Sequence, residues 1–318
     1  MMHIQMNSYH NKEKLILSNV SKSYNNTLVL EDINIKVNEG ELVTILGPSG
    51  SGKSTIFNII TNLTQKDNGN VYIDGKISYM QQKDLLLPYK TIIDNVSLPL
   101  ILNKENKKNA QEIVRPYFKE FGLEGYEDKY PSELSGGMKQ RVMIAIALVG
   151  SPSIVIADEP TTSLDVTIEA QILDVLKNLQ KTLGTSIILI THDLGVIAKL
   201  CDRVLVMYGG KIVERGSVDE IFYDTAHPYT KGLMHSIAKL DTAKGHKLQP
   251  IEGTPPDLFA PPKGCPFAAR CEYCMEICKD MPPQTYELSK EHETCCWLQH
   301  EYAPDTDMRR KVTEKGEV

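Results

Sequence analysis

The chain of 318 residues is longer than one typical domain, so we expect a large domain with a smaller appendage. Its 35 Lys and Arg residues against 41 Asp and Glu residues give a net charge of -6, and no tract has the basic density that binds nucleic acid, which argues against a nucleic-acid partner. The longest uncharged stretch, Val142 to Ala157, is broken by Gly150 and Pro152, and the polar N-terminus lacks a signal-peptide pattern. We therefore expect no membrane span and no export, and predict a cytoplasmic chain or one docked on the inner face of a membrane.

In chain order, the first structural signal is a set of short apolar runs that alternate with helical patterns. The runs Leu42 to Leu46, Ser153 to Ala157 and Ser186 to Ile190 have the length of strands that are buried on both faces. Between the last two runs, apolar residues recur at helical spacing until Gly184 ends the pattern. This alternation predicts an α/β fold with a mainly parallel sheet and crossover helices.

The run GPSGSGKST directly follows the first predicted strand and opens a helical pattern. It fits the phosphate-binding pattern G-x-x-x-x-G-K-[ST], in which backbone N–H groups and the helix N-terminus surround phosphate oxygens. In such a loop, Lys53 reaches the β and γ phosphates of a nucleoside triphosphate and Ser54 offers its hydroxyl to Mg²⁺. The alternative is a Gly-rich turn that matches by chance, which the strand and helix on either side disfavour. The residues expected to hold the nucleotide are Gly47, Pro48, Ser49, Gly50, Ser51, Gly52, Lys53, Ser54 and Thr55.

The segment that follows the phosphate loop and the next β-rich stretch has a different residue pattern. From Leu85 to Ser135 the pattern is helical and polar. We predict a helical subdomain over about residues 85–135, inserted between two halves of the sheet. The prolines that interrupt its pattern are Pro88, Pro99, Pro116 and Pro131.

An acidic pair ends the second buried strand, in the run IVIADE from Ile154 to Glu159. Asp158 at a strand end is placed to hold Mg²⁺ through water, and Glu159 beside it to polarise the attacking water as a general base. Acidic pairs at strand ends are common in α/β proteins, so the position of this pair relative to the phosphate loop is what favours a catalytic role.

Several motifs together point to a family. The discriminating run is LSGGMKQR from Leu134 to Arg141, and it occurs together with SLD at Ser163 to Asp165 and ITHD at Ile190 to Asp193. With the phosphate loop and the acidic pair, these motifs make the chain resemble an ABC-transporter ATPase subunit over roughly residues 14–240. The resemblance implies an ABC-type P-loop ATPase core with a mainly parallel sheet, an antiparallel β region and a helical subdomain, followed by a small irregular extension over residues 241–318.

The same resemblance implies roles for single residues. Tyr24 takes the place of the aromatic residue that stacks on adenine, with an ordinary core tyrosine as the alternative. Gln82 takes the place of the glutamine that contacts Mg²⁺ and water and senses the membrane partner, with Gln81 as the alternative register. Asp165 matches the residue at the dimer seam, and His192 matches the switch histidine on the γ-phosphate.

The signature loop implies a dimer. Ser135, Gly136 and Gly137 match the loop that grips the γ-phosphate of ATP bound to the other subunit. This loop lies far along the chain from the phosphate loop and, in the fold that the resemblance implies, cannot reach the nucleotide bound to its own chain. The resemblance therefore implies that each site needs two chains, either identical or paralogous. The expected further partners are two separate permease subunits and an extracellular solute-binding protein.

Two parts of the sequence resemble different transporter types. From about Leu134 onward, runs such as HPYTKGLMHSI and GTPPDLFAPPKGCPFAARC resemble the ATPase subunits of oligopeptide and dipeptide importers. The segment Tyr72 to Leu100 instead resembles nitrate, sulfonate and taurine importers. Peptide import is the leading prediction and the nitrate, sulfonate or taurine type is the alternative.

The extension holds six of the seven cysteines. In the peptide-importer subunits that it resembles, four cysteines can hold a four-iron four-sulfur cluster, and Cys265, Cys271, Cys278 and Cys296 fall at matching places. Zinc is the second possibility, and a set of reduced thiols in a loosely packed tail is the third.

Two other classes of function compete with transport. A soluble ABC ATPase of DNA repair or translation usually carries two cassettes or a long coiled-coil insertion, and this sequence has neither. An iron–sulfur sensor that regulates transport would add to the first interpretation and would not replace it.

Overall fold

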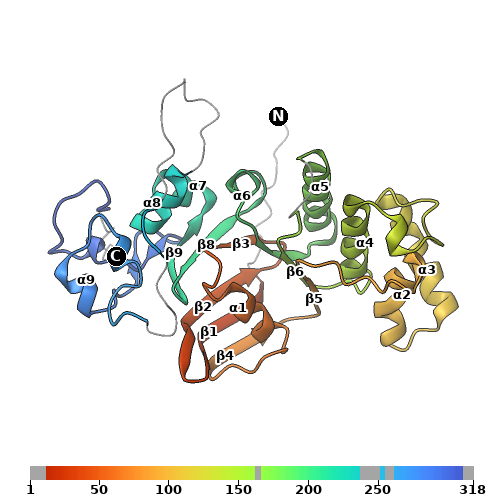
Figure 1. Cartoon of the computed structure of the whole chain (residues 1–318), viewed down its shortest axis with the longest axis horizontal. Coiled ribbons are helices and arrows are strands. Elements are labelled where there is room, and N and C mark those ends of the chain that lie inside the picture. The colour runs from red at the N-terminus through yellow and green to blue at the C-terminus, as the bar shows by residue number, and fades with distance from the viewer. Residues whose placement is uncertain (1–11, 162–165, 237–250, 255–260, 311–318) are drawn as a thin grey trace, which may run out of the picture.

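The structure is a computed structural model that describes residues 12–161, 166–236, 251–254 and 261–310. Its described strands form two sheets (Figure 1). The main sheet has eight strands in the order β10-β11-β9-β8-β3-β7-β6-β5. They are β3 (Leu42–Leu46), β5 (Ile77–Met80), β6 (Ile154–Asp158), β7 (Ser186–Ile190), β8 (Arg203–Tyr208), β9 (Lys211–Ser217), β10 (Tyr286–Glu287) and β11 (Glu293–Thr294).

The smaller sheet is antiparallel, with the order β2-β1-β4. Its strands are β1 (Glu13–Tyr24), β2 (Thr27–Asn38) and β4 (Asn68–Ile73). In the main sheet β5, β6, β7, β3 and β8 pair in parallel, which confirms the predicted mainly parallel sheet, whereas β9 is antiparallel to β8.

The main sheet is buried on both faces because its central strands β3, β6 and β7 consist almost entirely of apolar residues. One face packs with helix α1 (Lys53–Ile60) against the smaller sheet, so that Ile45, Phe57 and Val37 share one core. The opposite face packs against helices, and Leu42 and Val155 belong to that second core. The helices that cover it include α4 (Gly136–Leu148), α5 (Val166–Leu183) and α6 (Leu194–Leu200).

A helical subdomain forms as expected between β5 and β6. It contains α2 (Ile92–Leu102), α3 (Lys107–Glu120) and a short 3-10 turn at Pro131–Glu133, and it leads into α4. Figure 1 shows α2, α3 and α4 at one end of the molecule and α9 (Glu276–Asp280), in the C-terminal extension, at the other. One expectation was wrong: Pro99 and Pro116 lie inside α2 and α3 and do not interrupt them. Packing of these helices offsets the backbone hydrogen bond that each proline removes.

The end of the chain is more regular than its Pro-rich sequence suggests. Helices α7 (Val218–Tyr223) and α8 (Pro228–His235) follow β9, where Ser217 and Glu220 form a capping box for α7. The extension is largely irregular, but its strand β11 pairs with β9 and so joins the edge of the main sheet. The predicted boundary at residues 240 and 241 lies outside the described residues.

One buried carboxylate fastens the extension to the core. The Glu214 side chain accepts hydrogen bonds from the backbone N–H groups of Ala226 (2.6 Å) and His227 (3.1 Å), and it lies 2.9 Å from Nε2 of His292. The side chains of Glu214 and His292 are 0% and 1% exposed. Because a buried charge is tolerated only with such partners, this cluster fixes where β11 docks.

Candidate nucleotide-binding site

The phosphate loop lies between β3 and α1, as the sequence predicts. A Cβ on Gly47 would come within 2.6 Å of the Met207 carbonyl oxygen, which leaves room only for glycine there. Gly52 has φ of 101° and serves as the residue before the first turn of α1. The chain can therefore turn sharply from the strand into a helix whose free N–H groups face the loop.

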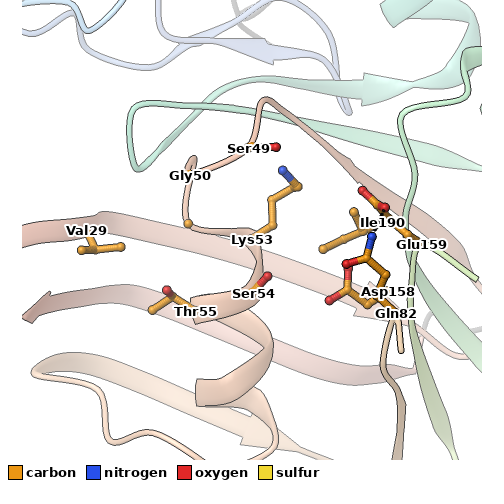
Figure 2. A pocket seen from close by; sticks show the side chains of 11 residues that line it. Val29, Ser49, Gly50, Lys53, Ser54, Thr55, Gln82, Asp158, Glu159 and Ile190 are labelled. Carbon is orange, nitrogen blue, oxygen red and sulfur yellow. Dashed lines mark hydrogen bonds between the residues drawn. The ribbon is translucent and has the colours of Figure 1, made fainter. Parts of the chain in front are cut away.

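The loop opens onto a pocket of about 490 Å³ at the carboxyl end of the parallel strands. Figure 2 shows the side chains of Gln82, Asp158 and Glu159 gathered on one side of it, while Lys53 extends toward the loop near Ser49. Three segments that are distant in sequence therefore meet at one cavity, which is wide enough to admit a nucleotide. The lining residues are Val29, Ser49, Gly50, Gly52, Lys53, Ser54, Thr55, Gln82, Asp158, Glu159 and Ile190.

The Lys53 ammonium group is held above the loop. Its Nζ donates to the carbonyl oxygens of Gly47 and Pro48, each at 2.8 Å. Burial lowers the pKa of Lys53, and the nearby carboxylates of Glu159 and Asp158 act in the opposite direction. The positive charge thus lies beside the cavity, where a polyphosphate would gain from it.

Asp158 ends β6 and faces the same cavity. Its Oδ2 accepts a hydrogen bond from the Tyr79 hydroxyl at 3.2 Å. Burial raises the pKa of Asp158, and the Glu159 carboxylate raises it further, whereas the Tyr79 hydrogen bond and Lys53 oppose the rise. Burial is also the main reason that the pKa of Tyr79 is raised, so its hydroxyl keeps its proton and donates.

Glu159 follows immediately with a positive φ of 48°, which is uncommon for a residue with a side chain. The Gln82 amide Nε2 donates to Glu159 Oε2 at 2.6 Å, and Nδ1 of His192 lies 3.6 Å from Oε1. The structure therefore brings Gln82 and His192 to Glu159, whereas Gln81 does not line the pocket. Unusual backbone at a residue that faces a cavity is typical of functional sites.

The oxygen donors around the pocket suit Mg²⁺. The Ser54 hydroxyl, the Asp158 carboxylate and the Gln82 side-chain amide all line it, and hard oxygen ligands are what this ion prefers. Together with the phosphates of a nucleotide, such a set provides the few protein ligands that a magnesium–nucleotide site uses.

Other predicted residues lie elsewhere. Ser135 caps α4, where its side chain accepts from the Met138 backbone N–H at 3.4 Å, and Gly136 and Gly137 open that helix. None of the three lines the pocket in this chain, nor does Tyr24, which is 43% exposed. Asp165 lies outside the described residues.

The sequence did not single out Tyr79, Val29 or the hydroxyl contact to Asp158. Tyr79 is three residues before Gln82 on the strand that delivers it, and this spacing is the only signal that the sequence offers for it. Val29 comes from β2 of the smaller sheet, and no local pattern links it to the phosphate loop.

The four cysteines of interest also meet. Cys265, Cys271, Cys278 and Cys296 line one small cavity together with His227, whereas Cys274 and Cys295 do not line it. Burial raises the pKa of Cys265 to about 11 and that of Cys271 to about 12, so these thiols keep their protons unless a metal replaces them.

The cavity itself is tight. Its volume is about 10 Å³, the space of roughly one water molecule. Among the residues that the structure describes, no group of three or more His, Cys, Asp and Glu side chains is arranged to hold a metal ion. The soft thiolate donor set suits iron or zinc, but the structure does not confirm the predicted cluster.

Comparison with known proteins identifies the family. Residues 30–162 match the family described as ABC transporter, and residues 213–278 match the one described as the C-terminal region of oligopeptide/dipeptide transporters. The chain is 43% identical to the dipeptide transport ATP-binding protein DppD of Bacillus subtilis, over 83% of this chain and 87% of that protein. It is 40% identical to the oligopeptide transport ATP-binding protein OppD of Salmonella typhimurium, over 80% and 83%.

Solved structures agree with these matches. The ATP-binding cassette MJ0796, in a dimeric post-hydrolysis state bound to ADP and Pi, is 33% identical and superposes with a TM-score of 0.59, covering 64% of this chain and 98% of that one. The protein cbiO1 from Clostridium perfringens, part of the ABC transporter complex cbiONQ, is 30% identical with a TM-score of 0.62, over 67% and 92%.

The comparisons also bear on transporter type. The two relatives DppD and OppD are peptide-transport proteins, so the resemblance of Tyr72 to Leu100 to nitrate, sulfonate and taurine importers is not confirmed. No helix in the described part of the chain is long and apolar enough to cross a membrane. The chain belongs to the ATP-binding subunits of the ABC transporter family, and it is an ATPase whose hydrolysis of ATP is coupled to transport.

Proposed function

We propose that the chain powers the import of dipeptides or oligopeptides. The observation that carries the proposal is the match of residues 213–278 to the C-terminal region of oligopeptide/dipeptide transporters. The ATPase core is common to the whole family, so a type-specific extension carries more information about the cargo than the core does.

We propose different roles for the residues that line the pocket. Lys53 and the N–H groups at the start of α1 would bind the phosphates, with Ser54, Asp158 and Gln82 as the residues that would hold Mg²⁺. Bound Mg²⁺ would neutralise charge on the phosphates. Glu159 would accept the proton of the attacking water.

We further propose that a second chain completes each site. The pocket is open toward solvent, and Ser135 to Gly137 of the same chain do not reach it. The hydroxyl of Ser135 and the N–H groups at the start of α4 form an anion-binding helix terminus, which suits the γ-phosphate of a nucleotide on the partner. Asp165 would then lie at the seam between the chains, His192 would contact the γ-phosphate, and Tyr24 would stack on adenine.

The remaining partners follow from the transport role. In a peptide importer of the kind that DppD and OppD serve, two separate permease subunits would form the path for the cargo, and an extracellular solute-binding protein would deliver it. The chain would therefore work at the cytoplasmic face of the cell membrane. We divide it into an ATPase domain over residues 14–240, which includes the helical subdomain, and an extension over residues 241–318.

Uptake measurements test the cargo. A strain that carries Glu159→Gln in place of the native residue should lose uptake of a radiolabelled tripeptide and keep uptake of labelled taurine and nitrate. A strain with Glu112→Gln, an exposed carboxylate on α3, is the matched control and should transport the peptide at the parental rate. If taurine or nitrate uptake fails and peptide uptake persists, the assignment to peptide import is wrong.

A narrower proposal concerns the cysteines. We propose that Cys265, Cys271, Cys278 and Cys296 hold a four-iron four-sulfur cluster, with their common cavity in support and its small volume requiring the thiols to move apart. Protein purified without oxygen should contain about four iron and four sulfide per chain. A protein with zinc or without metal under those conditions contradicts the cluster, and Cys274→Ser should leave the iron content unchanged.

A further inference from the structure

Asp158 is held by a residue outside the motifs of the family. The Tyr79 hydroxyl donates to Asp158 Oδ2 at 3.2 Å, and it comes from β5, the strand at the edge of the main sheet. In the register of β5 and β6, Tyr79 pairs with Ile156, two residues before Asp158. Side chains two positions apart on a strand share a face, so the tyrosine reaches diagonally to the end of β6.

The Tyr79 ring is itself fixed. It stands edge-on to the ring of Phe57, with the centroids 5.9 Å apart and the planes at 73°. Phe57 is fully buried in α1, four residues after Lys53. An edge-to-face pair of this kind is a preferred arrangement of aromatic rings, so it restricts where the hydroxyl can lie. The same side chain thus contacts the helix that follows the phosphate loop and the carboxylate that faces it.

We propose that Tyr79 is a positioning residue for the magnesium site, which orients the Asp158 carboxylate so that its other oxygen faces the cavity. This proposal rests on the proposed role of Asp158 in holding Mg²⁺. One oxygen of a carboxylate that accepts a fixed hydrogen bond leaves the second free to contact the ion or its water, and such supporting contacts commonly tune metal affinity. Gln82, which follows on the same segment, donates to Glu159, so both carboxylates receive a hydrogen bond from this edge of the sheet.

The test compares nucleotide affinity with and without the metal. Binding of a fluorescent N-methylanthraniloyl ATP is measured in EDTA and in excess Mg²⁺, and the ratio of the two dissociation constants gives the gain due to the metal. Tyr79→Phe keeps the ring against Phe57 and removes only the hydroxyl. It should leave affinity in EDTA unchanged and reduce the gain by roughly threefold to tenfold, the net value of one ordinary hydrogen bond.

The matched control is Tyr72→Phe, the same change at a tyrosine of β4 that is 55% exposed, and it should change neither constant. If Tyr79→Phe keeps the full gain, or weakens binding equally in EDTA and in Mg²⁺, the hydroxyl is only structural and the inference is wrong. If the parent chain shows no gain from Mg²⁺, the assignment of Asp158 itself fails, which separates the two outcomes. Thermal unfolding of both variants verifies that neither has lost its fold.

Discussion

The nucleotide pocket and the junction between the main sheet and the extension differ in how their charged groups are satisfied. At the nucleotide pocket, Lys53, Asp158 and Glu159 line a cavity of about 490 Å³ and keep side-chain atoms directed toward open space. At the junction with the extension, Glu214 is enclosed and accepts from two backbone N–H groups and His292. The first arrangement leaves charge available for a ligand, and the second uses its charge entirely for docking. Functional and structural carboxylates are thus distinguished here by what remains for them to bind.

The largest expected effect tests the pocket side of this contrast. Glu159→Gln removes the proposed general base and leaves the phosphate loop intact, so ATP turnover should fall by about 10²-fold to 10⁴-fold while ATP binding persists. Steady-state hydrolysis measures the ATP turnover of the variant. Size-exclusion chromatography with ATP should show a stable dimer. If the variant hydrolyses ATP at the parental rate, Glu159 is not the general base.

The next effect tests the junction. Glu214→Ala leaves His292 and two buried N–H groups without an acceptor, which should lower the free energy of unfolding by about 3–5 kcal/mol. Urea titration of the full chain measures this loss. Glu291→Ala, a change at an exposed carboxylate of the same extension, should alter stability little. A Glu214→Ala chain as stable as the parent would mean that the cluster does not fasten the extension.

The free energy of unfolding should also depend on pH through His227, a buried residue at the same junction, and this effect is of intermediate size. Burial lowers the pKa of His227 to about 3, and its Nε2 has no hydrogen-bond partner among the described residues. Between pH 6.5 and 3 the unfolded chain binds a proton that the folded chain does not, so stability falls as pH falls through this range. The loss between pH 7 and pH 5 should be about 2 kcal/mol for this one group.

The comparison of variants isolates that contribution. His227→Phe should unfold with a weaker pH dependence between pH 7 and 5, whereas His235→Phe, at an exposed position of α8, should keep the parental dependence. Urea midpoints at both pH values supply the measurement. Equal pH dependence in all three chains would show that His227 takes up its proton without unfolding.

The smallest expected effect concerns adenine. Tyr24 is 43% exposed and does not line the pocket, so its stacking on a nucleotide would be peripheral. Tyr24→Ala should weaken binding of the fluorescent ATP by about threefold to tenfold, while Tyr24→Phe retains the ring and the affinity. If Tyr24→Ala binds the fluorescent ATP as tightly as the parent chain, Tyr24 does not stack on adenine and is an ordinary structural residue.

Short-range pattern explains which parts of the site could be predicted. The phosphate loop and the pair Asp158 and Glu159 lie directly after buried strands, and parallel strands carry their carboxyl ends to one edge, so the sequence places these residues together. The Tyr79 contact depends on the register between β5 and β6, and the sequence contains no signal for that register. The pairing of β11 with β9 likewise joins residues about eighty positions apart, beyond the reach of any local periodicity.

The helical subdomain shows the limit of propensity. Four prolines suggested repeated interruption, yet Pro116 lies within a helix whose Val114 and Phe118 are buried against its neighbours. The burial of such side chains outweighs the cost of one missing backbone hydrogen bond.

The distance along the chain between Glu214 and His292 has a consequence for synthesis. While the ribosome makes the protein, strand β9 and the Glu214 carboxylate are synthesised well before His292 leaves the exit tunnel. During that time β9 has no β11 to pair with. Until then β9 presents an unpaired edge that can join another growing chain. The 78 positions that separate Glu214 from His292 therefore set how much further chain must be made before β9 can be paired within its own subunit.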